Sequence, residues 1–295
     1  MHLKAPAKIN WSLDTLGSRA DGYHLLDMVI QSVALHDSLE IEPADTLTLF
    51  TDGRVHVPQD GTNLALRAAQ ALQKHAGVNR GAVLRLHKRI PTGAGLGGGS
   101  SDAAAVLRGL NSLWGLGYSL DDLCEIGLSI GADIPYCLHG GLCRVQGIGE
   151  IISPLETDKV FHLVILQPCR ALSTRQVFTA LGAGAPAQHP DTEGVIRALR
   201  GGQYAALAAA MGNTLQAVSA SFRPEIRQAV THLKEYGAKA AQMTGSGSAV
   251  FGVFATAAAA RTAWEALSRR YRVCHLTQTL PNEIRNPQFI VNNSL

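Results

Sequence analysis

Hydrophobic and polar residues alternate near the start of the chain, and this period of two predicts a β-strand over residues 7–14. The same alternation places Lys8, Asn10 and Ser12 together on the polar face of that strand, opposite one buried face. A longer apolar run follows over residues 25–35. The chain is therefore predicted to open with strands, one of which carries a polar face.

Apolar residues at helical spacing predict helices over residues 63–76, 103–114 and 120–130. Ser119 followed three residues later by Asp122 is typical of a capping box at the start of the third helix. The second half of the chain is predicted to hold strands at 161–166 and 273–280, a strand, glycine turn and strand over 243–251, and helices at 192–200, 204–220, 224–236 and after Thr256. Strands and helices mix without strict β-α-β alternation, so the pattern predicts an α+β protein.

The composition is that of a globular protein, with 46% hydrophobic and 17% charged residues in 295. The chain has no run of about 18 apolar residues, and its N-terminus carries charge and proline, so we expect neither a membrane span nor secretion. The five cysteines include no C-x-x-C pair, and the net charge is only +3, which gives no reason to expect a zinc knuckle or nucleic acid. A cytoplasmic protein fits these observations.

The densest glycine cluster lies between a predicted strand and a predicted helix, with five glycines at positions 93–99. Glycines let backbone N–H groups approach a ligand closely, and a helix N-terminus adds partial positive charge. An ordinary strand-to-helix turn does not need five residues of such conformational freedom. The sequence therefore predicts that this loop holds phosphate groups.

Two common phosphate-binding loops fit this stretch poorly. Residues 93–98 match G-x-G-x-x-G, but the acidic residue that a dinucleotide site requires falls at Asp121, at the start of a predicted helix. A P-loop requires lysine after its last glycine, whereas Gly99 is followed by Ser100. Neither H-R-D nor D-F-G of the protein kinases occurs. A nicotinamide-dependent oxidoreductase stays open as a weaker alternative.

Residues 91–103 resemble the ATP-phosphate loop of the GHMP kinases, small-molecule kinases named for galactose, homoserine, mevalonate and phosphomevalonate. Residues 6–10 and 244–248 resemble two further motifs of that family, in the same order along the chain. Together with residues 19–24, they are similar to the branch that phosphorylates the 2-hydroxyl of a cytidine-diphosphate-linked methylerythritol, in the non-mevalonate isoprenoid pathway. The resemblance covers roughly residues 3–280.

This resemblance implies a two-domain GHMP kinase fold with the active site in the cleft between the domains. The N-terminal ATP-binding α/β domain would cover residues 1–155 and the C-terminal α+β domain residues 156–280, while the polar tail 281–295 is expected to be loosely ordered. ATP and Mg²⁺ are the implied cofactors, and the partner is the small cytidine-diphosphate-linked sugar alcohol. The sequence does not indicate the ligands of Mg²⁺ or the oligomeric state.

The positions that match the family motifs acquire expected roles. Asp133 would accept or orient the proton of the substrate hydroxyl, and Lys8 would support both the ionised carboxylate and the developing phosphoryl charge. The cytosine would stack on Tyr23, make polar contacts with His24, and meet Phe178 on its other side. The other expected substrate residues are Asn10, Gly245, Ser246 and Gly247, and those of the phosphate loop are Pro91, Gly93, Ala94, Gly95, Leu96, Gly97, Gly98, Gly99, Ser100 and Ser101.

Each of these residues also has an ordinary structural interpretation. Asp133 could end a helix, Lys8 could be an exposed strand lysine, Phe178 could belong to the core, and residues 245–247 could form a hairpin turn. Two functional alternatives stay open besides the oxidoreductase. One is another GHMP kinase, acting on mevalonate or homoserine, and the other is a catalytically silent module that keeps the nucleotide-binding fold.

Overall fold

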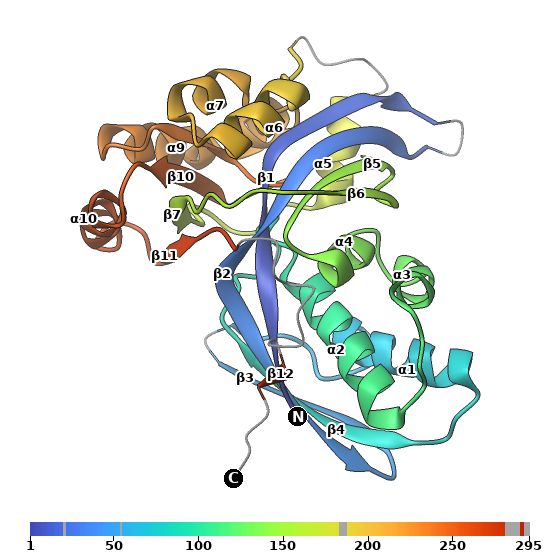
Figure 1. Cartoon of the computed structure of the whole chain (residues 1–295). Coiled ribbons are helices and arrows are strands. Elements are labelled where there is room, and N and C mark those ends of the chain that lie inside the picture. The colour runs from blue at the N-terminus through green and yellow to red at the C-terminus, as the bar shows by residue number, and fades with distance from the viewer. Residues whose placement is uncertain (20–21, 54, 183–187, 281–289, 292–295) are drawn as a thin grey trace.

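Twelve strands form two sheets in the part of the chain that the computed structural model describes, which is residues 1–19, 22–53, 55–182, 188–280 and 290–291 (Figure 1). The strands are β1 (His2–Ser18), β2 (His24–Ala44), β3 (Leu47–Gly53), β4 (Gly81–Lys88), β5 (Leu142–Gly147), β6 (Ile151–Leu155), β7 (His162–Leu166), β8 (Gly212–Asn213), β9 (Ala240–Met243), β10 (Val250–Phe254), β11 (Cys274–Gln278) and β12 (Ile290–Val291). The eight-stranded sheet has the order β12-β1-β2-β4-β3, with β5 beside β2, β6 beside β5 and β8 beside β1. The four-stranded sheet has the order β11-β7-β10-β9.

Ten helices cover these sheets within the described ranges. They are α1 (Leu64–Ala76), α2 (Gly98–Trp114), α3 (Leu120–Leu128), α4 (Ile134–His139), α5 (Thr174–Leu181), α6 (Thr192–Gly201), α7 (Tyr204–Ala210), α8 (Gln216–Phe222), α9 (Glu225–Glu235) and α10 (Ala257–Leu267). Figure 1 shows α1 to α4 gathered beside the large sheet, while α9 and α10 lie by the small one. The α+β class is confirmed.

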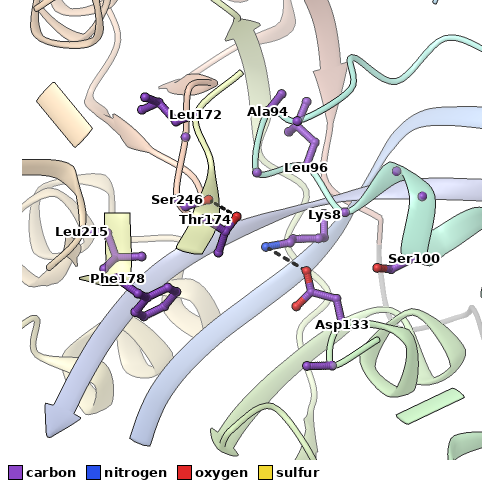
Figure 2. A pocket seen from close by; sticks show the side chains of 18 of the residues that line it. Lys8, Ala94, Leu96, Ser100, Asp133, Leu172, Thr174, Phe178, Leu215 and Ser246 are labelled. Atoms are coloured by element: carbon purple, nitrogen blue, oxygen red, sulfur yellow. Dashed lines mark hydrogen bonds and ion pairs between the residues drawn. The ribbon is translucent and has the colours of Figure 1, made fainter. Parts of the chain in front are cut away.

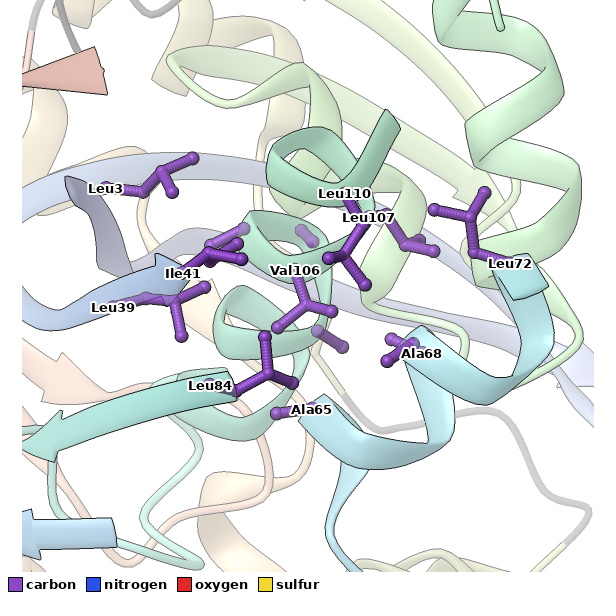
Figure 3. Close-up of a cluster of buried hydrophobic side chains, with 14 of the residues drawn as sticks. Leu3, Leu39, Ile41, Ala65, Ala68, Leu72, Leu84, Val106, Leu107 and Leu110 are labelled. Atoms are coloured by element: carbon purple, nitrogen blue, oxygen red, sulfur yellow. The ribbon is translucent and has the colours of Figure 1, made fainter. Parts of the chain in front are cut away.

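The core beside the large sheet is built from alternate strand residues and two helix stripes (Figure 3). Leu39, Ile41 and Leu84 point from β2 and β4 toward Val106 and the neighbouring apolar residues of α2. The facing stripe of α1 includes three buried alanines, whose small side chains let the two helices approach closely. This packing fixes α2, and with it the end of the glycine loop, against the sheet.

The two longest strands, β1 and β2, pass through the whole molecule and link its two halves (Figure 1). Their antiparallel pairing is irregular between Pro6 and Lys8 and again between Asn10 and Ser12. Such irregularities bend a strand and re-aim its side chains. They flank the segment of β1 that carries Lys8 and Asn10.

Two of the predicted helices need correction, and one further helix was missed. The helix expected over residues 103–114 begins earlier, at Gly98, because packing of α2 on the sheet overrides the low helix propensity of glycine. The helix expected over 204–220 is interrupted: residues 212–213 pair in parallel with β1. There Asn213 Nδ2 donates to Met243 O and Gly245 O, and such side-chain bonds to the backbone compete with a helix. The helix α5 was not predicted at all.

The predicted domain boundary after residue 155 falls between β6, a strand of the large sheet, and β7, the first strand of the small sheet. The small strand β8 nevertheless joins the large sheet by pairing with β1. Most of the tail predicted to be loosely ordered lies outside the described residues, as do residues 20–21 of the 19–24 motif. The exception in the tail is β12, which pairs with His2 and Leu3 of β1.

Candidate active site

A cavity of about 1150 Å³ lies where the glycine loop, the β1–β2 strands, α5 and the start of α4 meet. It collects predicted site residues that are far apart in the sequence. Asn10 and Ser101 do not line it. Those that do are Lys8, Tyr23, His24, Pro91, Gly93, Ala94, Gly95, Leu96, Gly97, Gly98, Gly99, Ser100, Asp133, Phe178, Gly245, Ser246 and Gly247.

The glycine loop requires its glycines for two physical reasons. Gly93, Gly95 and Gly97 have positive φ, which other residues rarely adopt. A Cβ on Gly95 would also collide with Thr244 O. Gly97 is the N-cap of α2, and it carries no side chain to cap the helix. Ser100 and Ser101 lie inside α2 and therefore do not cap it.

The start of α2 is suited to a phosphate group. Ser101 N donates to Gly97 O at 2.9 Å and so closes the first helical turn. The N–H groups of the residues before it have no acceptor within the helix. They belong to Gly98, Gly99 and Ser100, which line the cavity. Together with the positive end of the helix dipole, they fit the phosphates of ATP.

A second glycine segment, residues 244–247, packs directly on the first. Gly245 and Gly247 also have positive φ, and a Cβ on Gly245 would lie 2.9 Å from Gly95 O. Asn10 fixes this segment, because its Oδ1 accepts from Gly245 N at 3.0 Å and from Thr244 Oγ1 at 3.1 Å. Asn10 is fully buried, so its role in this structure is to hold residues 244–245 in position.

Lys8 and Asp133 face each other in the cavity (Figure 2). Lys8 Nζ lies 3.9 Å from Asp133 Oδ2 and donates to Asn10 Oδ1 at 2.9 Å. The Lys8 side chain is 6% exposed, whereas that of Asp133 is 44% exposed. The expected polar face of β1 is therefore buried, because residues 93–97 and 244–247 cover it.

Asp133 does not play the structural role that its sequence position also allowed. It occupies the N-cap position of α4, but its side chain makes no capping hydrogen bond. Pro135 stands in the first turn of that helix, and the segment that ends at Asp133 leads directly into α4. The carboxylate is left facing the cavity, where a hydroxyl group of a substrate can reach it.

Aromatic rings lie at another part of the same cavity. The rings of His24 and Phe178 have centroids 5.0 Å apart and an interplanar angle of 32°. Tyr23 lines the cavity as well and is 59% exposed. Phe178 is half-buried: it packs against the hydrophobic core and also lines the cavity, so it combines the core position and the site position that its sequence allowed. The three rings supply a surface on which a flat base can stack.

A cluster that the sequence did not indicate lies behind the glycine loop. Lys88 Nζ donates to Asp37 Oδ2 and, at 2.5 Å, to Asp102 Oδ2, and no more than 3% of each side chain is exposed. Asp37 Oδ1 also accepts from the backbone N–H of Ile90, at 2.8 Å. Asp102 of α2 is thus buried in an ion-pair cluster.

Asp102 and Lys88 of this cluster differ in how burial and their neighbours shift the pKa. Burial raises the pKa of Asp102 to about 8, and neighbouring Asp37 adds to this effect while Lys88 opposes it. Burial also disfavours the charge of Lys88, but the two carboxyl groups outweigh it, so the pKa of Lys88 is raised. Asp102 Oδ1 is buried with no hydrogen-bond partner among the described residues. One lysine cannot hold two buried carboxylates ionised, so Asp102 is the protonated member at neutral pH.

The described residues contain no cluster of three or more His, Cys, Asp or Glu side chains that could hold a metal ion. Among the helices described, none is long and apolar enough to cross a membrane.

Comparison with known proteins places the chain in a family. The profile of the GHMP kinases N terminal domain matches residues 63–141, and that of the GHMP kinases C terminal domain matches residues 195–273. The chain belongs to the GHMP kinase family. It is therefore an ATP-dependent small-molecule kinase, and the nicotinamide-dependent alternative falls away.

Relatives of high similarity carry one name. A 4-diphosphocytidyl-2-C-methyl-D-erythritol kinase of Alkaliphilus metalliredigens (strain QYMF) is 40% identical over 280 residues, which cover 95% of this chain and 96% of the relative. The kinase of the same name from Levilactobacillus brevis is 41% identical over 283 residues, covering 94% of this chain and 98% of the relative.

Solved structures agree with this placement. A crystal structure of 4-(cytidine 5'-diphospho)-2C-methyl-D-erythritol kinase has a TM-score of 0.81 and 32% identity, covering 95% of this chain and 99% of that one. A homoserine kinase from Cytophaga hutchinsonii has a TM-score of 0.73 at 17% identity, covering 95% and 94%. The second match shows the shared fold alone.

Proposed function

We propose that this kinase transfers the γ-phosphoryl group of ATP to the 2-hydroxyl of 4-diphosphocytidyl-2-C-methyl-D-erythritol, in the non-mevalonate isoprenoid pathway. The observation that carries the proposal is one cavity that holds both the Lys8–Asp133 pair and the aromatic surface of Tyr23, His24 and Phe178. Relatives about 40% identical over almost the whole chain support this choice of substrate.

Asp133 is the residue that we propose to handle the proton. The substrate hydroxyl donates a hydrogen bond to the exposed carboxylate, and its oxygen attacks the γ-phosphorus of ATP. A new O–P bond forms, the bond from the γ-phosphorus to the β–γ bridging oxygen breaks, and ADP leaves with that electron pair. The hydroxyl proton passes to Asp133 and then to solvent.

Lys8 and the helix N-terminus stabilise the charge of the transferring group. Lys8 Nζ is held by Asn10 Oδ1 at 2.9 Å and needs little reorganisation during the reaction. The N–H groups at the start of α2 offer fixed donors to the phosphate oxygens of ATP. The protein therefore contributes positioning and electrostatics, which dominate phosphoryl transfer.

We propose Mg²⁺ as the metal ion. Ser100 and Asp133 both line the cavity and offer a hydroxyl and a carboxylate oxygen, which are ligands that Mg²⁺ accepts. The neighbouring Ser101 is buried and does not line the cavity, so it does not fit this role. The ion would neutralise charge on the phosphate oxygens.

The aromatic surface also distinguishes the proposed substrate from those of other family members. Mevalonate and homoserine have no ring to stack, whereas a cytosine ring can stack on His24 and Phe178, or on Tyr23. The proposal implies a cytoplasmic enzyme with this small-molecule partner and no nucleic-acid or membrane partner. It also retains the domains 1–155 and 156–280 as functional units.

A coupled assay of ADP release across candidate alcohols tests the proposed function. We expect turnover with the cytidyl-methylerythritol compound and none above background with mevalonate or homoserine. Phosphorus NMR of the product should show a new monophosphate ester on the methylerythritol moiety. Turnover with mevalonate or homoserine but not with the cytidyl compound would show that the substrate is wrongly assigned.

A further inference from the structure

We propose that Arg175 binds the diphosphate group of the substrate. This inference rests on the proposed function, because the diphosphate belongs to the cytidyl compound. Arg175 stands in the first turn of α5, is exposed, and lines the cavity. No motif in the sequence indicated it.

The charges in the cavity single out Arg175. Three Lys or Arg residues of the described chain line it: Lys8, Lys88 and Arg175. Lys88 is buried between two carboxyl groups, and Lys8 faces Asp133. Arg175 has no ion pair with any described residue. Its charge is therefore available to an anion that enters the cavity.

The position of Arg175 along α5 matches the order of groups in the substrate. Arg175 precedes Phe178 by three residues, which is a rise of about 4.5 Å along the helix, and both residues line the cavity. The neighbouring Thr174 Oγ1 forms a hydrogen bond with Ser246 Oγ at 2.8 Å, which ties this end of α5 to the second glycine segment.

Figure 2 shows Thr174 between Phe178 and the Lys8–Asp133 pair in that view. In the substrate, the diphosphate likewise connects the cytidine to the alcohol that receives the phosphoryl group. A base stacked near Phe178 and a hydroxyl at Asp133 would place the diphosphate alongside the first turn of α5. Arg175 is the free cation at that turn.

The guanidinium group suits this ligand chemically. Arginine presents parallel N–H donors that bind phosphate oxygens in pairs, and such charge-assisted bonds are stronger than neutral ones. The competing anion in the same cavity is the triphosphate of ATP. Because the two anions belong to different substrates, steady-state kinetics separates them.

The first test removes the charge and keeps a polar side chain, with Arg175→Gln. We expect KM for the cytidyl compound to rise about tenfold. KM for ATP and kcat should stay within about twofold of the wild-type values, and the unfolding midpoint should not change. Arg175→Lys should recover part of the affinity. Arg261→Gln, at an exposed position of α10 outside the cavity lining, is the matched control and should change nothing. A rise in KM for ATP alone would overturn the proposal.

Calorimetry with substrate fragments gives the decisive readout. A non-hydrolysable ATP analogue first saturates the nucleotide site, and cytidine and cytidine 5'-diphosphate are then titrated into wild type and Arg175→Gln. We expect the substitution to weaken the diphosphate about tenfold and to leave cytidine unchanged. Equal weakening of both ligands, or of neither, would overturn the role of Arg175. If wild type binds neither fragment, the cytidyl compound is not the substrate, and the proposed role of Arg175 fails together with the proposed function.

Discussion

Two groups of lysine and aspartate flank the glycine loop, and they differ in the exposure of their carboxyl groups and in how closely their charges approach. Lys8 and Asp133 lie 3.9 Å apart, and nearly half of the Asp133 side chain is exposed. Lys88, Asp37 and Asp102 are in direct contact and almost wholly buried. The first group lies open to the cavity, while the second, of which only Lys88 lines the cavity, ties the end of β4 and α2 to β2.

The difference shows how burial decides what such residues do. A buried carboxylate must be neutralised, and in the second group one lysine and one bound proton accomplish this. Apart from Asp102 Oδ1, its polar atoms are satisfied by one another or by the backbone at Ile90, and they hold the loop in place. We call Lys8 and Asp133 the open pair, and Lys88, Asp37 and Asp102 the sealed group. The open pair keeps hydrogen-bonding capacity for a substrate. The contrast predicts that the sealed group controls stability and the open pair controls turnover.

The largest expected effect on stability comes from Lys88→Met. This change leaves the Asp37 carboxylate buried without its cation, and it should lower the free energy of unfolding by about 3–5 kcal/mol. Urea denaturation followed by circular dichroism measures it. The same substitution at Lys8 is the matched control. Lys8→Met should change the free energy of unfolding by no more than about 1 kcal/mol, yet reduce kcat by about 10²- to 10³-fold. Equal losses of stability in the two variants would erase the proposed contrast.

A smaller effect is expected from Gly95→Ala, between the two groups. Alanine at this positive φ is strained, and its Cβ would collide with Thr244 O, so we expect a loss of about 1–3 kcal/mol in stability together with weaker ATP binding. Gly115→Ala is the control, because Gly115 also has positive φ but faces open space. The control should cost about 1 kcal/mol and leave KM for ATP unchanged. Unaltered ATP affinity in Gly95→Ala would show that the loop shape does not serve the nucleotide.

The smallest expected effect is that of Asp102→Asn. Asparagine resembles the protonated carboxyl group, so the free energy of unfolding near pH 4, where the unfolded chain still holds much of that proton, should change by no more than about 1 kcal/mol. Wild type should lose stability as pH rises from about 4 to 8, because Asp102 with its pKa of about 8 keeps a proton in the folded state that the unfolded chain has released. Denaturation curves at pH 5 and pH 8 check this. The decline should be smaller in Asp102→Asn, and an identical decline would mean that Asp102 is ionised in the folded protein.

Much of the open site could be predicted from the sequence, because its residues lie in short local motifs. The glycine loop, Lys8 and Asp133 are each adjacent to residues that indicate their role, and the structure brings all of them to one cavity. The sequence could not indicate that the face of β1 with Lys8 is buried, since the segment that covers it lies more than 230 residues away, at Thr244.

The sealed group could not be predicted for the same physical reason. Asp37 and Lys88 are separated by 51 positions, and only the pairing of β2 with β4 brings them together. The helix α5, which carries Arg175, has the short apolar pattern of an ordinary surface helix and no motif. Asn213 broke a predicted helix through contacts with residues about 30 positions further on. Long-range contacts, rather than local preferences, decided these positions.

The most direct test of the account is kcat of Asp133→Asn with ATP and the cytidyl-methylerythritol compound, measured on protein whose unfolding curve is recorded in parallel. Asparagine keeps the size of the side chain but cannot accept the hydroxyl proton. We predict a fall in kcat of about 10²- to 10⁴-fold, an unfolding midpoint like that of wild type, and unchanged ATP binding. A kcat within a few-fold of wild type would contradict the assignment of the open pair as the site of phosphoryl transfer.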